Sequence, residues 1–244
     1  MKERPILFSG PMVRALLDGS KTQTRRVVKA QPPMDCGFVE TAFYNPIVID
    51  RNGDEQPGPE IFGAYSEDGS WGCKCPYGAP GDRLWVRESG VISKLRGTLD
   101  RPGLFRHDVP TTPTIGDYWV EETRAAGASY NVSGCPRSSA LLSYGAKACP
   151  SIHMPRWASR ITLEVTGVRV ERLQDISEDD AKAEGARLYA AANELSHGGW
   201  SHDEWHVHAS AKESFIRLWN GLAAPGSDWN ANPWVWVVEF KRAA

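Results

Sequence analysis

A short basic segment, Lys21-Thr22-Gln23-Thr24-Arg25-Arg26, gathers the side chains of this 244-residue chain that are best suited to chemistry. It carries one amine, two hydroxyls and two guanidiniums. Clustered cations lower the pKa of a lysine by like-charge repulsion, and a threonine hydroxyl needs such a base to act as a nucleophile. The same spacing fits a solvated basic loop or a phosphate clamp without catalysis. Because Lys and Thr are common on surfaces, spacing alone favours that second interpretation.

The helices and strands around this segment are predicted from capping residues and from the alternation of apolar and polar side chains. Ser9, Pro11 and the run to Leu17 predict a short helix that Gly19 ends, so the basic segment is expected to leave it as an exposed loop. A capping-box variant at Ser177 opens a second helix that ends near Gly185. A further helix is expected over 211–222, and strands over 83–88, 160–166, 168–173 and 234–240, the middle two as one long bent strand or a hairpin.

Two stretches rich in Gly and Pro, about 30–80 and 93–150, are predicted to be long irregular insertions, with only a weak strand signal at 46–50. The remaining elements are few strands with short helices between them. They predict an α+β fold, a small mixed β-barrel with short flanking helices, in a single domain spanning 1–244.

Composition excludes several classes of protein. A net charge of −2 gives no polybasic surface for long duplex DNA, and 41% apolar residues are enough for a full core. No segment approaches the roughly 18 apolar residues of a membrane span, and the first five residues lack the apolar core of a secretory signal. Five cysteines, an odd number, argue against a closed disulfide framework. We therefore expect a cytoplasmic protein without a membrane partner.

Several blocks, in order and covering roughly half the chain, resemble the ASCH domain family of the PUA-like superfamily. They are Pro5-Ile6-Leu7-Phe8, the helix ending in Gly19, Lys21-Thr-x-Thr-x-Arg26, and 81–88, 150–161, 177–184 and 237–242. The larger ASCH proteins of phages and prophages are the most similar members. The resemblance implies a PUA-like barrel that binds RNA or a nucleoside and requires no cofactor.

Some small ASCH proteins are amidohydrolases that remove the acetyl group from N(4)-acetylcytidine with a Lys, a Thr and a Glu. By motif position the resemblance implies Lys21 and Thr24, and the pattern Ser-Glu-x-x-Ala-x-x-Glu selects Glu184. In such a reaction Thr24 would attack the acyl carbonyl, Lys21 would take its proton, and Glu184 would orient the base or return a proton. Arg26 or a backbone N–H of 21–26 would face the oxyanion. The two insertions depart from the small members.

Further residues are candidates for binding the substrate. Glu88 could accept from a cytosine amine, although a strand-end salt bridge is the favoured alternative. Base stacking and phosphate contacts are one interpretation of the segment around Pro155, and fixing the start of the next strand is the other. The full set of substrate-binding candidates is Thr22, Arg25, Arg26, Trp85, Glu88, His153, Arg156 and Trp157.

Cys36, Cys73, Cys75 and Cys149, or His153 in place of the last, form a candidate structural zinc site, with ordinary free thiols as the favoured alternative. The histidines at 197, 202, 206 and 208 are interpreted mostly as part of a solvated loop.

The leading hypothesis is therefore hydrolysis of an acylated cytosine amine. The alternatives are an RNA-binding module without catalysis, and a ribonuclease.

Overall fold

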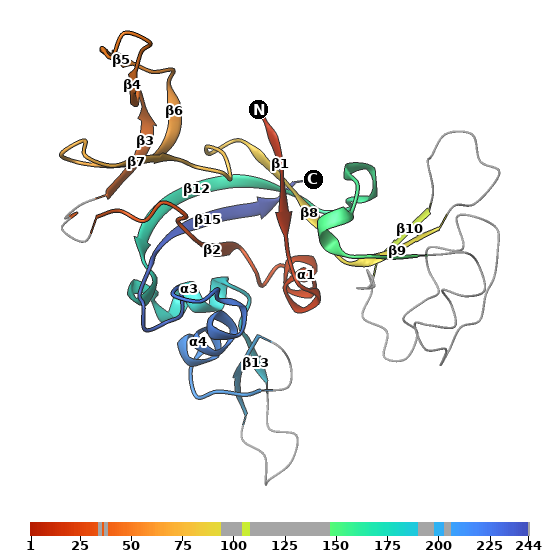
Figure 1. Ribbon diagram of the computed structural model, residues 1–244. Helices are drawn as coiled ribbons and strands as arrows, with labels where there is room; N and C mark the ends of the chain where they lie inside the picture. Colours follow the sequence, from red (N-terminus) through yellow and green to blue (C-terminus); the bar gives the residue numbers. More distant parts are fainter. Residues whose placement is uncertain are drawn as a thin grey trace.

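The computed structural model describes residues 1–33, 36, 39–93, 104–107, 147–189, 198–202 and 206–243. Its centre is a five-stranded sheet in the order β1-β8-β12-β15-β2 (Figure 1). The bounds are β1 Glu3–Leu7, β8 Arg83–Arg87, β12 Thr162–Arg172, β15 Trp234–Arg242 and β2 Gln23–Val27. β1 runs parallel to β8, and the other neighbours are antiparallel.

The alternation in β12 and β15 explains their central place. Leu163 and Val165 of β12 are buried, whereas Thr162 and Glu164, which alternate with them, are partly exposed. A register shift between Val165 and Gly167 bends β12, so the predicted long bent strand is correct. β15 is buried on both faces, which is why it reads as a continuous apolar run.

The two faces of this sheet belong to two apolar clusters. One contains Phe8, Leu84, Ile161, Trp236 and Val238 and is covered by α1, Gly10–Leu17. The other contains Leu173, Ile176, Phe215, Val235 and Val237 and is covered by α3, Glu178–Ala183, and α4, Ala211–Leu222. All three helices occur where the sequence predicts them, α1 and α3 from their capping residues.

The insertion at 30–80 is more regular than predicted. It contains β3 Val39–Tyr44, β4 Ile47–Ile49, β5 Glu55–Pro57, β6 Ile61–Ser66 and β7 Gly72–Lys74. β3, β6 and β7 form one antiparallel sheet, β4 and β5 form a hairpin, and this part projects from one end of the central sheet (Figure 1). The expectation of an irregular insertion here was wrong, because alternate polar and small residues such as Thr41, Gly63 and Ala64 pair well in a sheet that is only half buried.

β9 Gly90–Ser93 leads into the insertion at 93–150, of which the structure describes β10 Leu104–His107 and β11 Lys147–Cys149. These three strands form one antiparallel sheet. Short 3₁₀ turns follow: η2 Ser151–His153, η3 Arg156–Ala158 and, after β12, η4 Leu173–Asp175. β13 Arg187–Tyr189 and β14 Gly199–Ser201 pair beside α4.

The protein is thus α+β, rich in strands, with few helices, as the sequence predicts. The small mixed β-barrel that the sequence predicts is not confirmed, because the sheets of the described residues are open and none of them closes on itself. β1 and β2 are the edge strands of the central sheet and share no backbone ladder. Among the described helices, none has the length and apolar character needed to cross a membrane.

Candidate active site

Lys21 lies where the ends of two helices meet. Gly19, with φ of +81°, turns the chain after α1, and the Lys21 N–H donates to the Ala15 carbonyl at 3.0 Å. Lys21 then pairs with Glu184 in an isolated antiparallel bridge, and the Thr22 N–H donates to the Ala183 carbonyl at 2.9 Å. The backbone itself therefore brings position 21 beside position 184.

Glu184 is held by the geometry of α3. Ser177 accepts from the Asp180 N–H and Asp180 caps Ser177 in return, so the predicted capping box is present. Glu184 is the C-cap, and Gly185 follows with φ of +105°. A Cβ on Gly185 would lie 3.0 Å from the Ala15 Cβ and 3.3 Å from the Lys21 Cβ, so only glycine allows this close approach.

The side chains of Lys21 and Glu184 form a buried ion pair. Lys21 Nζ donates to Glu184 Oε2 at 2.8 Å and to the Glu184 carbonyl at 2.7 Å, and the Lys21 side chain is fully enclosed. Burial lowers the pKa of Lys21, and the charges of Arg26 and Arg25 add to the shift, whereas Glu184 opposes it. The amine is therefore easier to deprotonate than an exposed lysine.

Arg25 connects Glu184 to a wider charge network. Its guanidinium lies 3.4 Å from Glu184 Oε1, 2.5 Å from Glu171 Oε1 and 3.2 Å from Asp180 Oδ2. Both Glu184 oxygens thus contact a cation, Oε1 with Arg25 and Oε2 with Lys21. This arrangement fixes the carboxylate and balances its charge.

The Asp180 carboxylate also belongs to this network and contacts several of its side chains. Gln23 donates to its carboxylate at 3.1 Å and Arg169 contacts it at 3.2 Å. Burial raises the pKa of Asp180, but hydrogen bonds from Ser177 and Gln23 and the charge of Arg25 outweigh it and lower the pKa to about 2. Glu171 and Asp180 were not predicted to belong to the site. Their only sequence signals were the alternation of the long strand and the capping box.

Thr24 is buried on β2, paired with Val238 of β15. It belongs to the same strand face as Arg26, whereas Arg25 belongs to the face toward Glu171 and Asp180. Lys21 Nζ and the Arg26 guanidinium lie 5.6 Å and 5.4 Å from the centroid of one ring, that of Phe8. Within the described part of the chain the Thr24 hydroxyl makes no hydrogen bond. The convergence of Thr24 with Lys21 and Glu184 stays a prediction.

Arg26 also joins the two edges of the central sheet. Its Nη2 donates to the Leu7 carbonyl of β1 at 2.6 Å. This bond, together with the shared Phe8 ring, draws β1 and β2 toward each other without a backbone ladder. Of the backbone donors considered for an oxyanion, those of Lys21 and Thr22 are already bonded to carbonyls.

The expectation that 21–26 is an exposed loop was wrong. Gln23–Val27 is strand β2, and Lys21, Gln23, Thr24 and Arg25 are buried, leaving Thr22 exposed. Glu184, Glu171 and Asp180 compensate the charges of the segment, which is what allows so polar a sequence to enter the interior.

Trp85 and Glu88 lie in a second polar region. Trp85 is buried, and the guanidiniums of Arg87 and Arg156 lie 4.7 Å and 5.7 Å from its ring. Glu88 accepts from Arg160 Nε at 3.0 Å and Nη2 at 2.9 Å. The salt bridge at the strand end, the favoured alternative in the sequence, is therefore confirmed.

His153, Arg156 and Trp157 lie on the two 3₁₀ turns before β12, and all three are exposed. Arg156 forms a bidentate ion pair with Glu3 of β1, in which its Nε and Nη2 donate to the two carboxylate oxygens at 3.0 Å and 3.2 Å. The pair ties the turn to the start of β1, and Trp157 remains 42% exposed. No contact joins these residues to Lys21 in the described parts of the chain, so they form a separate surface.

The cysteines pack with the core. Cys75 is buried in the cluster that contains Phe8, and Cys36 and Cys73 pack against it. Burial raises the pKa of Cys73 and of Cys75 to about 11. Among the side chains that the structure describes, no three His, Cys, Asp or Glu form a group that could hold a metal ion. The Cys149 side chain lies outside the described residues, so the zinc site stays a prediction. His197 of the predicted solvated loop also lies outside them.

No family model, no curated protein and no solved structure matches the chain when it is compared with known proteins.

Proposed function

We propose that this protein is an ASCH-like hydrolase with a PUA-related fold, which removes the acyl group from the exocyclic amine of N(4)-acetylcytidine or a related modified cytosine. Lys21, Thr24 and Glu184 are its working groups. The observation that supports this most is the buried contact between Lys21 and Glu184, on an amine whose pKa is lowered. A base near neutrality requires that direction of shift.

The hydrogen bonds of Lys21 suit a base. A neutral amine has two N–H donors and one lone pair. Glu184 offers two acceptors, its carboxylate and its carbonyl, so it can engage both donors and leave the lone pair for a third partner. Thr24, three residues along the chain on β2, is the hydroxyl assigned to that lone pair.

The proposed reaction has two stages, transfer of the acyl group to Thr24 and hydrolysis of the resulting ester. The Thr24 oxygen attacks the acyl carbonyl while its proton passes to Lys21 Nζ. The C–N bond breaks, the departing exocyclic amine takes that proton, and the acyl group stays on Thr24 as an ester. Water then hydrolyses the ester, which releases the carboxylic acid and restores the hydroxyl. Glu184, fixed by Arg25, keeps the ammonium form of Lys21 stabilised between the two proton transfers.

The test is direct. Purified protein is incubated with N(4)-acetylcytidine, and release of cytidine is followed by chromatography. We expect turnover by the wild type and a loss of at least 100-fold in Lys21→Ala and Thr24→Ala, the range that a base or a nucleophile contributes. Lys241→Ala, a change at an exposed lysine, serves as the control. No turnover by the wild type contradicts the proposal.

A second function, an RNA-binding module without catalysis, is favoured by one observation. The Lys21 side chain is fully enclosed and already paired, which is also typical of a structural ion pair. In that case RNA oligonucleotides bind, no cytidine is released, and Trp157→Ala weakens binding, since this exposed indole offers a face for stacking.

A further inference from the structure

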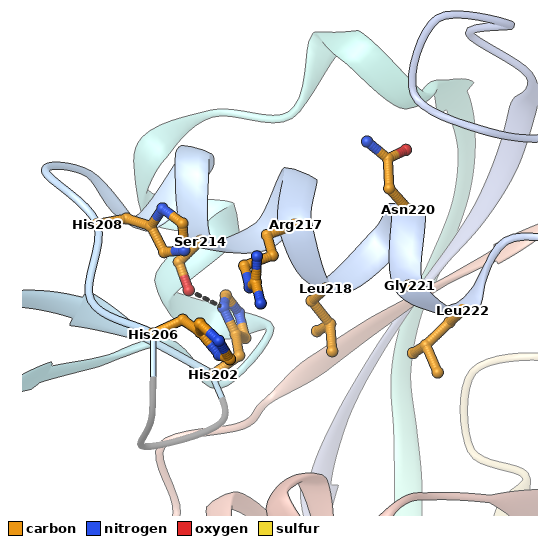
Figure 2. Close-up of a pocket in the computed structure, with 9 residues that line it drawn as sticks. All are labelled: His202, His206, His208, Ser214, Arg217, Leu218, Asn220, Gly221 and Leu222. Carbon is orange, nitrogen blue, oxygen red and sulfur yellow. Dashed lines mark hydrogen bonds between the residues drawn. The ribbon is translucent and has the colours of Figure 1, made fainter.

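A cavity of about 610 Å³ lies beside α4, between that helix and the segment that carries His202, His206 and His208 (Figure 2). Its volume is in the range of sites for small molecules. The residues that line it are His202, His206, His208, Ser214, Arg217, Leu218, Asn220, Gly221 and Leu222.

The backbone fixes one wall of this cavity. His208 pairs with Trp200 in a β-bridge, with N–H to carbonyl distances of 2.8 Å and 2.9 Å in the two directions. Gly199 permits the approach, because a Cβ there would lie 2.4 Å from the His208 carbonyl oxygen. The opposite wall is α4, whose N-terminal N–H groups at Ala211 and Lys212 donate to the Glu178 carboxylate at 2.6 Å and 3.1 Å.

The polar side chains that line the cavity are three imidazoles, a hydroxyl, a carboxamide and a guanidinium. His202 Nδ1 lies 2.7 Å from the Ser214 hydroxyl, which fixes the orientation of that ring. His208 Nε2 is buried and has no hydrogen-bond partner among the described residues, although buried polar atoms are nearly always paired. Arg217 is exposed and forms no ion pair within the part of the chain that the structure describes. Its guanidinium and the imidazoles of His202 and His206 lie near one another in Figure 2.

The charges of the side chains that line the cavity indicate which class of ligand it can bind. Among the lining residues that the structure describes, none is an aspartate or a glutamate, and one is a permanent cation. A guanidinium at the centre repels a metal cation, and the described side chains form no metal-binding group. A phosphate group has several acceptor oxygens and matches both the planar fork of an arginine and additional imidazole donors.

We propose that this cavity binds a phosphate group, either free or as the phosphomonoester of a nucleotide. Arg217 and His206 contact its oxygens, and His208 Nε2 gains its missing partner. Leu218 and Leu222 give the cavity an apolar part on which the rest of a nucleotide rests. The site is independent of the proposed hydrolase, because Phe215 lies between them, 5.9 Å from the Arg25 guanidinium and 6.2 Å from the His202 ring.

The experiment is isothermal titration calorimetry of the whole chain with orthophosphate, cytidine 5′-monophosphate and cytidine. We expect orthophosphate and the nucleotide to bind, with affinity reduced at least tenfold in Arg217→Gln and in His206→Gln. Both side chains are exposed, so these variants should keep the fold, which circular dichroism checks. Arg51→Gln makes the same change of charge in the turn between β4 and β5 and should bind as the wild type does.

The titrations also separate the two sources of phosphate. Tighter binding of the nucleotide than of orthophosphate identifies a nucleotide as the ligand, and equal binding identifies free phosphate. Failure of both phosphate compounds to bind overturns the proposal, and so does binding that Arg217→Gln leaves unchanged. Thr24→Ala should bind phosphate normally, so a failed hydrolase assay and a failed phosphate site are told apart.

Discussion

The pairing of Lys21 with Glu184 has a cost in stability as well as a use. Both side chains are buried, and neither charge is solvated by bulk water. Their charges are stabilised by each other and by Arg25, which in turn depends on Glu171 and Asp180. Removing any one of these groups leaves a buried charge less well compensated.

We expect Lys21→Met to destabilise the fold by about 3 to 4 kcal/mol, the lower part of the range for breaking a buried pair, because Arg25 still contacts Glu184. Urea unfolding measures the difference. Lys241→Met, which removes an exposed pair with Glu164, should change stability by less than about 0.5 kcal/mol. Equal effects of the two variants would show that the Lys21 pair contributes no more than a surface pair.

Asp180 predicts a specific sensitivity to acid. Its pKa is about 2 in the fold against an ordinary 3.8, so the folded state releases its proton more readily than the unfolded state. The resulting stability is complete above about pH 5 and is lost as the pH falls through the unfolded pKa toward about 2, a loss of about 1 kcal/mol after solvent screening. In Asp180→Asn the urea midpoint should be lower at pH 7, and this part of the acid dependence should disappear. An unchanged dependence between pH 4 and 2 would contradict the assigned pKa.

At the scale of single residues, the sequence named the pair at 21 and 184 only through a family resemblance. Spacing alone favoured a solvated basic loop, because the six residues contain no apolar side chain that would signal burial. The partners that make burial tolerable lie about 150 positions away, at Glu171, Asp180 and Glu184. The sequence pattern of a short segment does not show whether carboxylates so far away along the chain will neutralise its buried charges.

At the scale of elements, the close packing of the two helix ends depends on Gly185. We expect Gly185→Ala to destabilise the fold by about 1 to 3 kcal/mol, because of its positive φ and the contacts a Cβ would make with Ala15 and Lys21. Gly221→Ala is the matched control. Its Cβ meets nothing within 4 Å, and in helix α4 it should stabilise by about 0.5 to 1 kcal/mol. Thermal or urea unfolding compares the two, and equal effects would contradict the role of Gly185.

The elements that the sequence predicted well are those with strong local signals. α1, α3 and α4 begin at Pro or Ser caps, and β12 and β15 alternate or run apolar over many residues. The strands of the first insertion were missed because each is short and several carry polar or small residues, so their pairing depends on the neighbouring strand more than on their own composition.

At the scale of the whole molecule, the central sheet is open in its backbone pairing, yet its edges are joined by the bond from Arg26 to the Leu7 carbonyl. The sequence predicted a small mixed β-barrel because it has few strands with short helices between them. Closure, however, depends on whether two edge strands meet in register, and no single-strand pattern encodes that.

The β4–β5 hairpin is a separable part of the molecule. Every residue of both strands is exposed, and its ends meet where the Gly58 N–H donates to the Pro46 carbonyl at 2.7 Å. We expect replacement of 47–57 by an Asn-Gly turn to change stability by less than about 1 kcal/mol. By contrast, Val39→Ala, which truncates a buried residue of the core cluster, should cost about 1 to 2 kcal/mol. A hairpin deletion that unfolds the protein would show that this part packs more closely than its exposure indicates.

The most direct test of the proposed chemistry is the initial rate of N(4)-acetylcytidine deacetylation by Thr24→Val compared with the wild type. Valine keeps the volume of threonine and removes the hydroxyl, so the buried position on β2 stays filled. Thr166→Val makes the same change at an exposed site on β12. The proposal predicts loss of at least 100-fold in Thr24→Val with an unchanged rate in Thr166→Val. Full activity of a folded Thr24→Val protein would contradict it.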